Sequence, residues 1–235
     1  MESVRTVICL PTYEEADNLE GLVREILDVA PVDVLVVDDQ SPDGTGKVAD
    51  HLATEYSRVR ALHRRGPRSI ARAYSDAFAW AIEQGYEQIF QMDADYSHQP
   101  RYLPALLAAL ESADVVIGSR YVPGGGVDSW SLPRRFVSHV GNTYARSVMG
   151  LPYKDTTSGF VGFKRHVLQA IDFPELSEER RGFQLALKFR AHRKGFTIVE
   201  VPIRFWDRVV GASKLTAVDA VQSAWSAVRI RAALQ

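Results

Sequence analysis

Short apolar runs alternate with amphipathic segments along the first half of the chain. Runs rich in β-branched and apolar residues, with the length of buried strands, occupy residues 5–10, 32–37, 59–62, 88–92 and 114–117. Helical spacing of apolar positions occurs between them, at residues 18–29, 47–56, 72–84 and 102–110. This alternation predicts an α/β fold with a Rossmann-like, mostly parallel sheet that carries helices on both faces.

The second half of the chain is less regular. It predicts helices at residues 134–149 and 183–194, strands at 158–163 and 197–201, and a loop at 124–126. Neither an internal repeat nor a linker interrupts the pattern, so we expect one catalytic domain over residues 1–235. Asp43 and Thr45 are available to cap the helix that follows Gly44.

A C-terminal amphipathic helix is expected at residues 216–235. Val218, Val221, Trp225 and Val228 share its apolar face, and Arg229 and Arg231 follow near its end. One interpretation places this face on a membrane surface or a partner, where the arginines meet anionic headgroups. The alternative is that the face packs on the protein's own core.

Composition narrows the class of function. A formal net charge of −1 argues against general nucleic-acid binding, which needs a positive surface. The one cysteine, Cys9, lies in an apolar run and predicts a buried thiol in a reducing compartment. No run of 18 apolar residues or secretory leader is present, so we expect a cytoplasmic protein without a transmembrane segment, with contact at the inner membrane surface left open.

Polar clusters follow four of the predicted strands. They are residues 11–15, 38–41, 93–95 and 118–121. Ligands of open parallel sheets collect at the carboxyl ends of the strands, so these clusters are expected to meet at one edge.

Asp93 and Asp95 are the candidate metal ligands. Two carboxylates at a strand exit, separated by one small residue, can bind a divalent ion that also binds a nucleotide diphosphate. Hard oxygen ligands favour Mg²⁺ or Mn²⁺. A solvated turn is the alternative for such a pair, but its place between a strand and a helix favours the metal site.

Asp38 and Asp39 end another apolar strand, where they can accept hydrogen bonds from a nucleobase or from ribose hydroxyls. The alternative is that one of them caps the helix after Gly44. Tyr13 can pack on the base, with Glu15 at its edge, or it can simply pack beneath its own loop.

Arginines are the natural phosphate partners, because a guanidinium offers paired donors to phosphate oxygens. Arg134 and Ser138 are four residues apart and share a helical face, with Asn142 one turn further along. This face can hold an acceptor phosphate together with Arg120, whereas Arg135 is expected to be a solvated charge.

A second basic segment holds Arg208, Ser213 and Lys214 around Gly211, and it predicts either a mobile lid over the donor phosphates or a plain basic loop. The histidines lack metal-ligand spacing, and only His98, near the acidic pair, stands out. No Gly-x-x-x-x-Gly-Lys-Ser/Thr loop is present, which excludes that kind of ATPase or kinase chemistry.

Several motifs together resemble one enzyme family. They are Pro-Thr-Tyr-Glu-Glu, Val-Val-Asp-Asp-Gln-Ser-Pro-Asp-Gly-Thr, Met-Asp-Ala-Asp-Tyr-Ser-His-Gln-Pro, Gly-Ser-Arg-Tyr-Val-Pro-Gly-Gly-Gly-Val, Asp-Thr-Thr-Ser-Gly-Phe and Val-Glu-Val-Pro-Ile-Arg-Phe-Trp-Asp-Arg. From residue 7 to about 215 the chain resembles the family 2 glycosyltransferases, and within them the dolichol- or polyprenol-phosphate mannose synthases.

This resemblance implies a GT-A fold, an inverting transfer, a divalent metal, and a hexosyl donor such as GDP-mannose with a polyprenol phosphate acceptor. It places the nucleoside on Pro11, Tyr13, Glu15 and Asp39, with Asp38 beside them, and the metal on Asp93 and Asp95, with Asn142 as a further metal or phosphate contact. It also places the acceptor phosphate on Arg120, Arg134 and Ser138, and the mobile donor loop on Arg208, Ser213 and Lys214.

Two positions depart from the family pattern. Residues 66–72 replace a Gly-Leu-Gly turn, and Ala186 stands where the family commonly has glutamate. The altered loop predicts that Arg68 or Arg72 contacts a phosphate and that donor or acceptor preference has changed; neutral drift is the alternative. A related enzyme with a UDP-sugar donor and a soluble acceptor, or a noncatalytic nucleotide-sugar-binding protein, also stays open.

Overall fold

A computed structural model describes residues 4–128, 130–173, 182–206, 228 and 231–232 of the chain. Its elements in chain order are β1 (Thr6–Thr12), α1 (Ala16–Val29), β2 (Asp33–Asp38), α2 (Thr45–Glu55), β3 (Val59–His63), α3 (Ile70–Glu83), β4 (Gln88–Gln91), a 3₁₀ turn (Pro100–Tyr102), α4 (Leu103–Ser112), β5 (Val115–Ser119), β6 (Gly126–Val127), α5 (Leu132–Met149), β7 (Val161–Lys164), α6 (Arg165–Ala170), α7 (Phe183–Arg193), β8 (Ile198–Pro202) and β9 (Arg204–Phe205).

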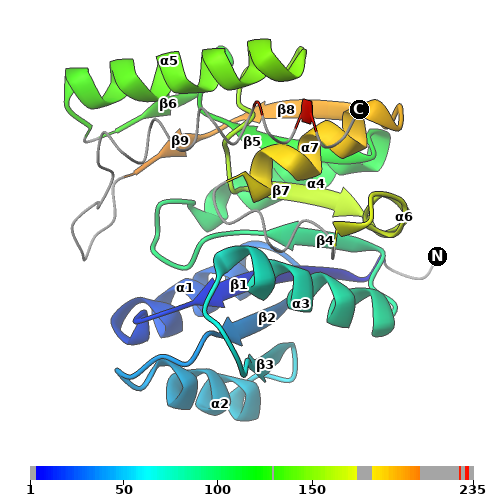
Figure 1. Ribbon diagram of the computed structural model, residues 1–235. Coiled ribbons are helices and arrows are strands. Elements are labelled where there is room, and N and C mark those ends of the chain that lie inside the picture. The colour runs from blue at the N-terminus through cyan, green and yellow to red at the C-terminus, as the bar shows by residue number, and fades with distance from the viewer. Residues whose placement is uncertain (1–3, 129, 174–181, 207–227, 229–230, 233–235) are drawn as a thin grey trace.

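Seven strands form the central sheet in the order β3-β2-β1-β4-β7-β5-β8 (Figure 1). All neighbouring pairs are parallel except those of β7, which runs antiparallel between β4 and β5. The predicted mostly parallel sheet is therefore confirmed. The reversed strand has a consequence for the site, because its amino end lies at the edge where its neighbours have their carboxyl ends.

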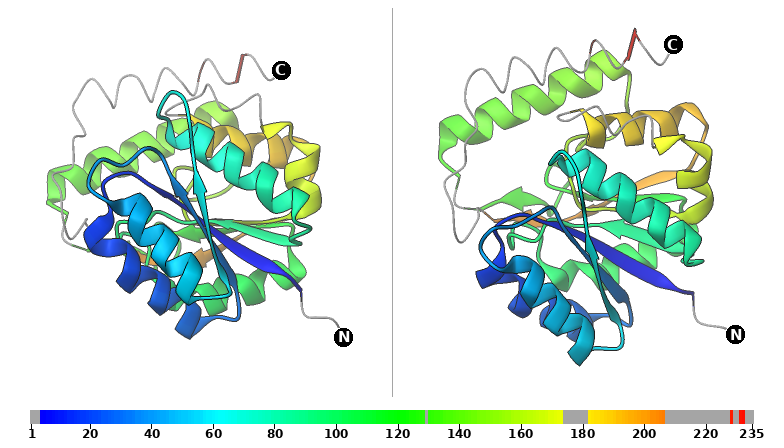
Figure 2. Two further views of the ribbon diagram at one scale, coloured as in Figure 1. Left: turned by 90° about the horizontal axis from the view of Figure 1, so that it is seen from below. Right: turned by 60° about the horizontal axis from the view of Figure 1, so that its bottom comes forward.

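Helices cover both faces of the sheet, as the apolar pattern predicted (Figure 2). Successive residues of one strand point to opposite faces, so Val7 and Cys9 of β1 enter one core while Ile8 and Leu10 enter the other. One core lies against α1, α2 and α4, and the other against α3, α6, α7 and the last turns of α5.

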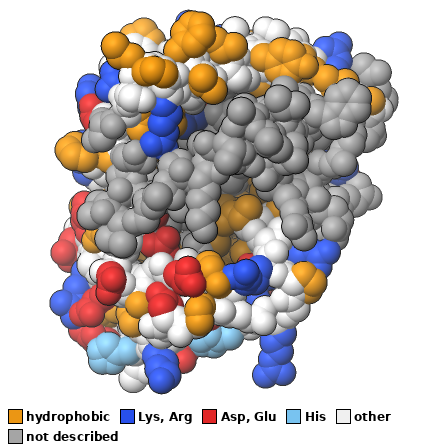
Figure 3. Space-filling model, turned by 60° about the vertical axis from the view of Figure 1, so that its left-hand side comes forward, with side chains coloured by type: hydrophobic (Ala, Val, Ile, Leu, Met, Phe, Trp, Pro, Cys, Tyr) orange, Lys and Arg blue, Asp and Glu red, His pale blue; other side chains and the backbone are white. Residues whose placement is uncertain are grey.

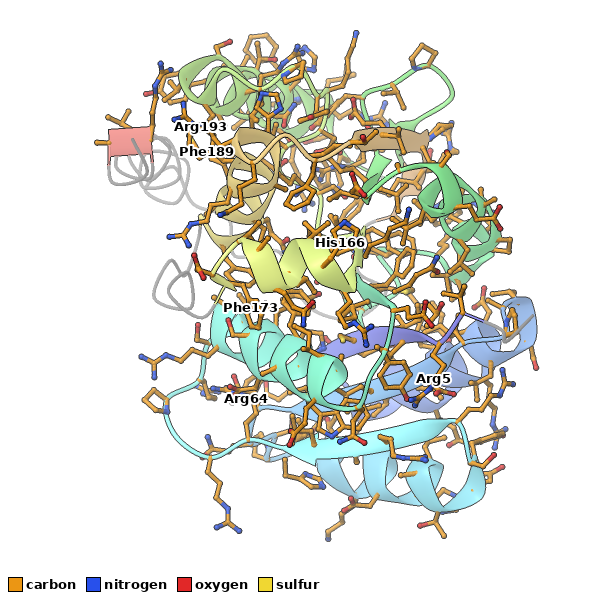
Figure 4. The ribbon with its side chains drawn as sticks, turned by 90° about the vertical axis from the view of Figure 1, so that its right-hand side faces the viewer. Arg5, Arg64, His166, Phe173, Phe189 and Arg193 are labelled. Carbon is orange, nitrogen blue, oxygen red and sulfur yellow. The ribbon has the colours of Figure 1, made fainter. Side chains whose placement is uncertain are left out.

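The second core is rich in aromatic rings. Phe173 lies between α6 and α3 in Figure 4 and meets the ring of Phe78 edge-on at 5.6 Å. Cys9 is fully buried, as predicted, and burial raises the pKa of its thiol.

Two expectations about local structure were wrong, and a third was confirmed in part. The N-cap residue of α2 is Gly44 in a left-handed conformation (φ 98°), so neither Asp38 nor Asp39 is the cap of that helix. The Asp43 carboxylate accepts the backbone N–H of Thr45, the first residue of α2, at 3.0 Å, and the Thr45 hydroxyl donates to it at 2.6 Å. Gly126 begins β6, a short strand paired with β9, rather than ending a loop.

The predicted C-terminal helix lies largely outside the described residues. Within it, Val228 is half-exposed and Arg231 donates a hydrogen bond to the carbonyl of Val148, at the end of α5. None of the described helices is both long enough and apolar enough to cross a bilayer.

Candidate functional site

The predicted strand exits meet at one edge of the sheet. β1, β2 and β4 are neighbours, so residues 11–15, 38–41 and 93–95 leave adjacent strands. Asp39 shows this directly, since its backbone N–H donates to Thr12 at 3.0 Å. β5 lies beyond β7, and therefore its exit at residues 118–121 is separated from the others by the segment that enters β7.

Asp93 and Asp95 follow β4 in different environments. The Asp93 side chain is 38% exposed, and its carboxylate accepts a hydrogen bond from the Tyr74 hydroxyl at 3.1 Å. Asp95 is only 5% exposed and accepts the backbone N–H of Ser97 at 3.1 Å. A β-carbon on Gly159 would lie 3.3 Å from Asp93 Oδ2, so the segment entering β7 passes directly over this carboxylate.

The Ser97 hydroxyl is a buried polar group without a hydrogen-bond partner among the described residues. Ser97 is 1% exposed and lies next to Asp95 through its own N–H. An unsatisfied buried hydroxyl costs about 1–3 kcal/mol, so this oxygen marks a place where an added ligand would be favourable.

His98 is part of the site but not a general base in this arrangement. The ring is 2% exposed, stacks on Phe160 at 5.2 Å, and accepts the backbone N–H of Asp93 at 3.2 Å. Burial lowers the pKa of His98, although Asp93 and Asp95 oppose the effect. The imidazole therefore stays neutral near pH 7 and holds the start of the Asp93 turn.

The predicted nucleoside residues lie at the exits of β1 and β2. Pro11 is buried, Tyr13 is 38% exposed, and Asp38 and Asp39 are each 6% exposed. Glu15 is the N-cap residue of α1, and its carboxylate accepts a hydrogen bond from the Asn18 amide at 2.8 Å.

Asp39 anchors the loop that departs from the family pattern. Its carboxylate accepts the backbone N–H of Ser69 at 2.9 Å and pairs with Arg64, which also bonds Asp76 at 2.6 Å. Figure 4 shows Arg64 on the connection between β3 and α3.

The loop then places the Arg68 guanidinium 4.1 Å from the centre of the Tyr13 ring. Ser69 caps α3 by accepting the N–H of Arg72. Thus the altered loop is tied to two predicted nucleoside residues.

Arg120, predicted to bind phosphate, is held by a buried ion pair. Its Nε and Nη2 atoms donate to the Asp155 carboxylate at 2.7 and 2.8 Å, and Nη2 also donates to Thr157 at 2.8 Å. Burial alone would raise the pKa of Asp155, but the Arg120 guanidinium outweighs it and lowers that pKa. Arg120 is thereby fixed beneath the β5 exit.

The inner face of α5 carries the other predicted acceptor residues, and the shared helical face is confirmed. Arg134 and Ser138 are half-buried and Asn142 is buried, whereas Arg135 is exposed as expected. Ser138 shares a hydrogen bond of 2.8 Å with the Tyr121 hydroxyl. The Arg134 guanidinium lies 4.2 Å from the centre of the Trp130 ring.

Asn142 has a structural task in this arrangement. Its amide oxygen accepts both the N–H and the hydroxyl of Thr156, at 2.9 and 3.0 Å, and its amide nitrogen donates to the Lys154 carbonyl. These bonds use both lone pairs of the oxygen. Asn142 therefore holds the segment that enters β7, and we do not include Asn142 among the proposed metal ligands.

Lys188 of α7 is a fully buried cation under the same segment. Its ammonium donates to the carbonyls of Thr156 and Ser158 at 3.1 and 2.7 Å, and burial lowers its pKa to about 7. On the other side, the Glu200 carboxylate accepts the N–H groups of Lys154 and Asp155. Charges from three elements thus fix residues 154–158.

The sequence analysis assigned no role to Asp155, Lys188, Ser97 or Trp130. Asp155 and Ser97 stand in motifs that were recognised, but neither motif shows which side chain pairs with which. For Lys188 the only signal is its place in α7 between the apolar residues Leu187 and Phe189. Arg208, Ser213 and Lys214 lie outside the described residues.

Comparison with known proteins gives matches at two levels of similarity. Residues 7–172 match the family described as Glycosyl transferase family 2. An undecaprenyl-phosphate mannosyltransferase of Micrococcus luteus is 44% identical over 214 residues, covering 91% of this chain and 88% of the relative. A polyprenol monophosphomannose synthase of Mycolicibacterium smegmatis is 43% identical over 215 residues, covering 90% and 81%.

Solved structures with a similar fold are more distant in sequence. Glucosyl-3-phosphoglycerate synthase from Mycobacterium tuberculosis, in complex with Mn²⁺, uridine diphosphate and phosphoglyceric acid, superimposes with a TM-score of 0.71 at 13% identity. The alignment covers 97% of this chain and 79% of that one. This likeness supports the GT-A fold.

Proposed function

The chain belongs to glycosyl transferase family 2, and from that premise we propose that it transfers mannose from a nucleotide sugar to a polyprenyl phosphate. The observation that carries the proposal is the sequence identity of 44% and 43% to two enzymes named for this reaction, over nine-tenths of the chain. The same relatives favour the usual acceptor over the changed preference expected from the altered loop. GDP-mannose is the donor that the family resemblance implies.

The residues at the β4 exit suit a divalent metal. Asp93 offers a partly exposed carboxylate, Asp95 a buried one, and the Ser97 hydroxyl beside them has no described partner. No cluster of three or more His, Cys, Asp or Glu side chains able to hold a metal occurs within the described ranges. Mg²⁺ and Mn²⁺ fit such a site, because Mg²⁺ is commonly held by one or two carboxylates and completed by phosphates and water.

Asp93 and Asp95 would hold this ion, and its charge would stabilise the departing nucleoside diphosphate. Arg134 and Ser138 would bind the acceptor phosphate, with Arg120 held rigidly by Asp155 behind them. An oxygen of that phosphate attacks C1 of the mannose from the side opposite the diphosphate, so the configuration inverts. A phosphate monoester is ionised near pH 7, and the step therefore needs no strong general base, consistent with a buried, neutral His98.

The nucleoside would lie at the exits of β1 and β2. Asp38 and Asp39 offer carboxylate oxygens there, Glu15 stands at the start of α1, and Tyr13 offers a partly exposed ring. Arg68, stacked on that ring, would hold the ring in position for the base.

A transfer assay with radiolabelled donor tests the proposal. Wild-type protein with Mn²⁺, GDP-[¹⁴C]mannose and undecaprenyl phosphate should give label that extracts into organic solvent, and undecaprenol should give none. UDP-[¹⁴C]glucose with the same lipid is the control donor. Label from UDP-glucose but not from GDP-mannose would contradict the proposed donor, and transfer to undecaprenol would contradict the phosphate acceptor.

A lipid acceptor also requires contact with a membrane, and α5 offers a surface for it. Large apolar side chains at spacings of four residues are exposed along its outer face: Leu132, Phe136, Val140 and Tyr144, with Val137 beside them. α5 carries three arginines and no acidic residue. Figure 3 shows apolar side chains along the top of the molecule, where α5 lies, and acidic ones on the lower half. We infer that the outer face of α5 rests on an anionic bilayer.

Vesicle sedimentation tests this contact. Wild type should sediment with vesicles of phosphatidylcholine and phosphatidylglycerol, and the double variant Phe136→Glu/Val140→Glu should not, because it places two charges on the buried face of the contact. A matched double variant on the exposed surface of α2, Lys47→Glu/His51→Glu, should sediment like wild type. Equal sedimentation of wild type and the α5 variant would refute the contact.

A further inference from the structure

Trp130 carries a buried N–H group for which the described part of the chain offers no acceptor. The residue is 9% exposed, and its indole Nε1 has no hydrogen-bond partner among the described residues. The indole N–H can only donate, and leaving such a group unpaired costs about 1–3 kcal/mol. A buried tryptophan usually finds a partner for this group, so its isolation here points to an acceptor that arrives with a ligand.

The surroundings of Trp130 belong to the proposed acceptor site. The guanidinium of Arg134 lies over its ring at 4.2 Å, and Phe205 meets the ring edge-on at 5.5 Å. Phe205 in turn contacts His98 at 5.5 Å and lies under the Arg120 guanidinium at 5.3 Å. Trp130 therefore stands in a row of rings that runs from the turn of Asp93 to the first turn of α5.

We propose that the Trp130 indole N–H donates a hydrogen bond to the phosphate of the acceptor lipid. This inference rests on the proposed function. A phosphate bound by Arg134 brings anionic oxygens beside the indole, and these are acceptors only. The indole N–H lies in the plane of the ring, so the guanidinium stacked on the ring face does not cover it, and both groups can donate to one phosphate. The ring thus positions the arginine, and its N–H adds a neutral donor to the charged one.

The variant Trp130→Phe tests the contribution of the N–H group separately from that of the aromatic ring. Phenylalanine keeps an aromatic face under Arg134 but cannot donate. The KM for farnesyl phosphate, a short acceptor, should rise about tenfold, which corresponds to the lower end of the free energy of a hydrogen bond to a charged group. The KM for the donor should stay constant. The matched control is Trp80→Phe on α3, where the ring packs on Tyr86 at 5.8 Å away from the site. It should leave both KM values unchanged.

A spectroscopic readout locates the bond itself. The chain has four tryptophans, and the spectrum of ¹⁵N-tryptophan-labelled Trp130→Phe identifies the Trp130 indole signal in the wild type. Farnesyl phosphate added with GDP and Mn²⁺ should move the proton of that signal downfield, and farnesol should not. Inorganic phosphate should move it in the same direction at higher concentration, because the proposed partner is the phosphate.

Two failures have different meanings. If the wild type mannosylates neither farnesyl phosphate nor undecaprenyl phosphate, the proposed function itself is refuted. If transfer proceeds but the Trp130 signal does not move, or Trp130→Phe keeps the wild-type acceptor KM, only the role of Trp130 is overturned.

Discussion

The donor half and the acceptor half of the site are built in different ways. In the donor half, Asp39 and Asp93 emerge directly from β2 and β4, and the parallel sheet brings them to one edge, where a buried pair with Arg64 also holds Asp39. In the acceptor half, Arg120 reaches its place through Asp155, on a segment that is held by Lys188 and Glu200 from two further elements. Backbone geometry places the donor carboxylates at the sheet edge, whereas the position of Arg120 in the acceptor half depends on buried charges.

This difference predicts whether a substitution lowers turnover or the stability of the fold. A donor-half carboxylate such as Asp93 is partly exposed and free of ion pairs with arginine or lysine in the described residues, so its replacement should affect turnover more than folding. The acceptor half contains buried charges that neutralise one another. Removing one of them leaves its partner unpaired in a low-dielectric interior, so stability should fall as well.

Asp155→Asn should have the largest effect and should act on stability. It leaves the Arg120 guanidinium buried without its counter-ion, which costs about 3–5 kcal/mol. Urea unfolding measures the change. Asp128→Asn, which breaks the exposed pair with Arg204, is the control and should change little. A wild-type unfolding midpoint for Asp155→Asn would show that the acceptor half does not depend on this pair.

The pH dependence of unfolding tests the contribution of Asp155 to stability in a second way. The pKa of Asp155 is lowered in the folded protein relative to its ordinary value of 3.8. Its contribution is therefore complete above about pH 4 and is lost as the pH falls through the folded pKa. Asp155→Asn should remove that part of the acid dependence.

Asp95→Asn should reduce turnover by about 10²-fold or more with little loss of stability, because metal stabilisation of the leaving group supplies several kcal/mol. Asparagine keeps an oxygen that can accept the Ser97 N–H. Turnover with excess Mn²⁺ measures the effect, and wild type in excess EDTA should show a similar loss. Full activity in EDTA would rule out the metal site.

Arg134→Ala should raise the acceptor KM by about ten- to a hundredfold, since a charged phosphate contact contributes about 1.5–3 kcal/mol. Steady-state kinetics with varied undecaprenyl phosphate gives this value, and the donor KM should not change. Arg135→Ala, one residue along and exposed, is the matched control. Equal effects of Arg134→Ala and Arg135→Ala would show that the acceptor KM depends only on net charge.

Arg68→Ala should have the smallest effect, a two- to fivefold rise in the donor KM. An exposed cation–π contact such as that with Tyr13 contributes about 0.5–1 kcal/mol. Arg65→Ala in the same loop should change nothing. A rise above tenfold would instead support the expectation that Arg68 contacts a phosphate directly.

The two halves also differ in how well the sequence predicts them. Strand period and strand exits placed Asp38, Asp39, Asp93 and Asp95 at one edge, because those features depend only on local pattern and parallel pairing. The helical face of Arg134 and Ser138 was predicted for the same reason. Pairing partners far apart in the chain leave no local signal, so neither the Arg120–Asp155 pair nor the antiparallel β7 that positions Asp155 could be predicted.

Calorimetric titration of GDP, with and without Mn²⁺, tests the division into a donor half and an acceptor half most directly. Wild type and Arg134→Ala should bind GDP with equal affinity and with the same dependence on Mn²⁺, whereas Asp95→Asn should lose the Mn²⁺-dependent part. Loss of GDP affinity in Arg134→Ala to the extent seen in Asp95→Asn would contradict the account.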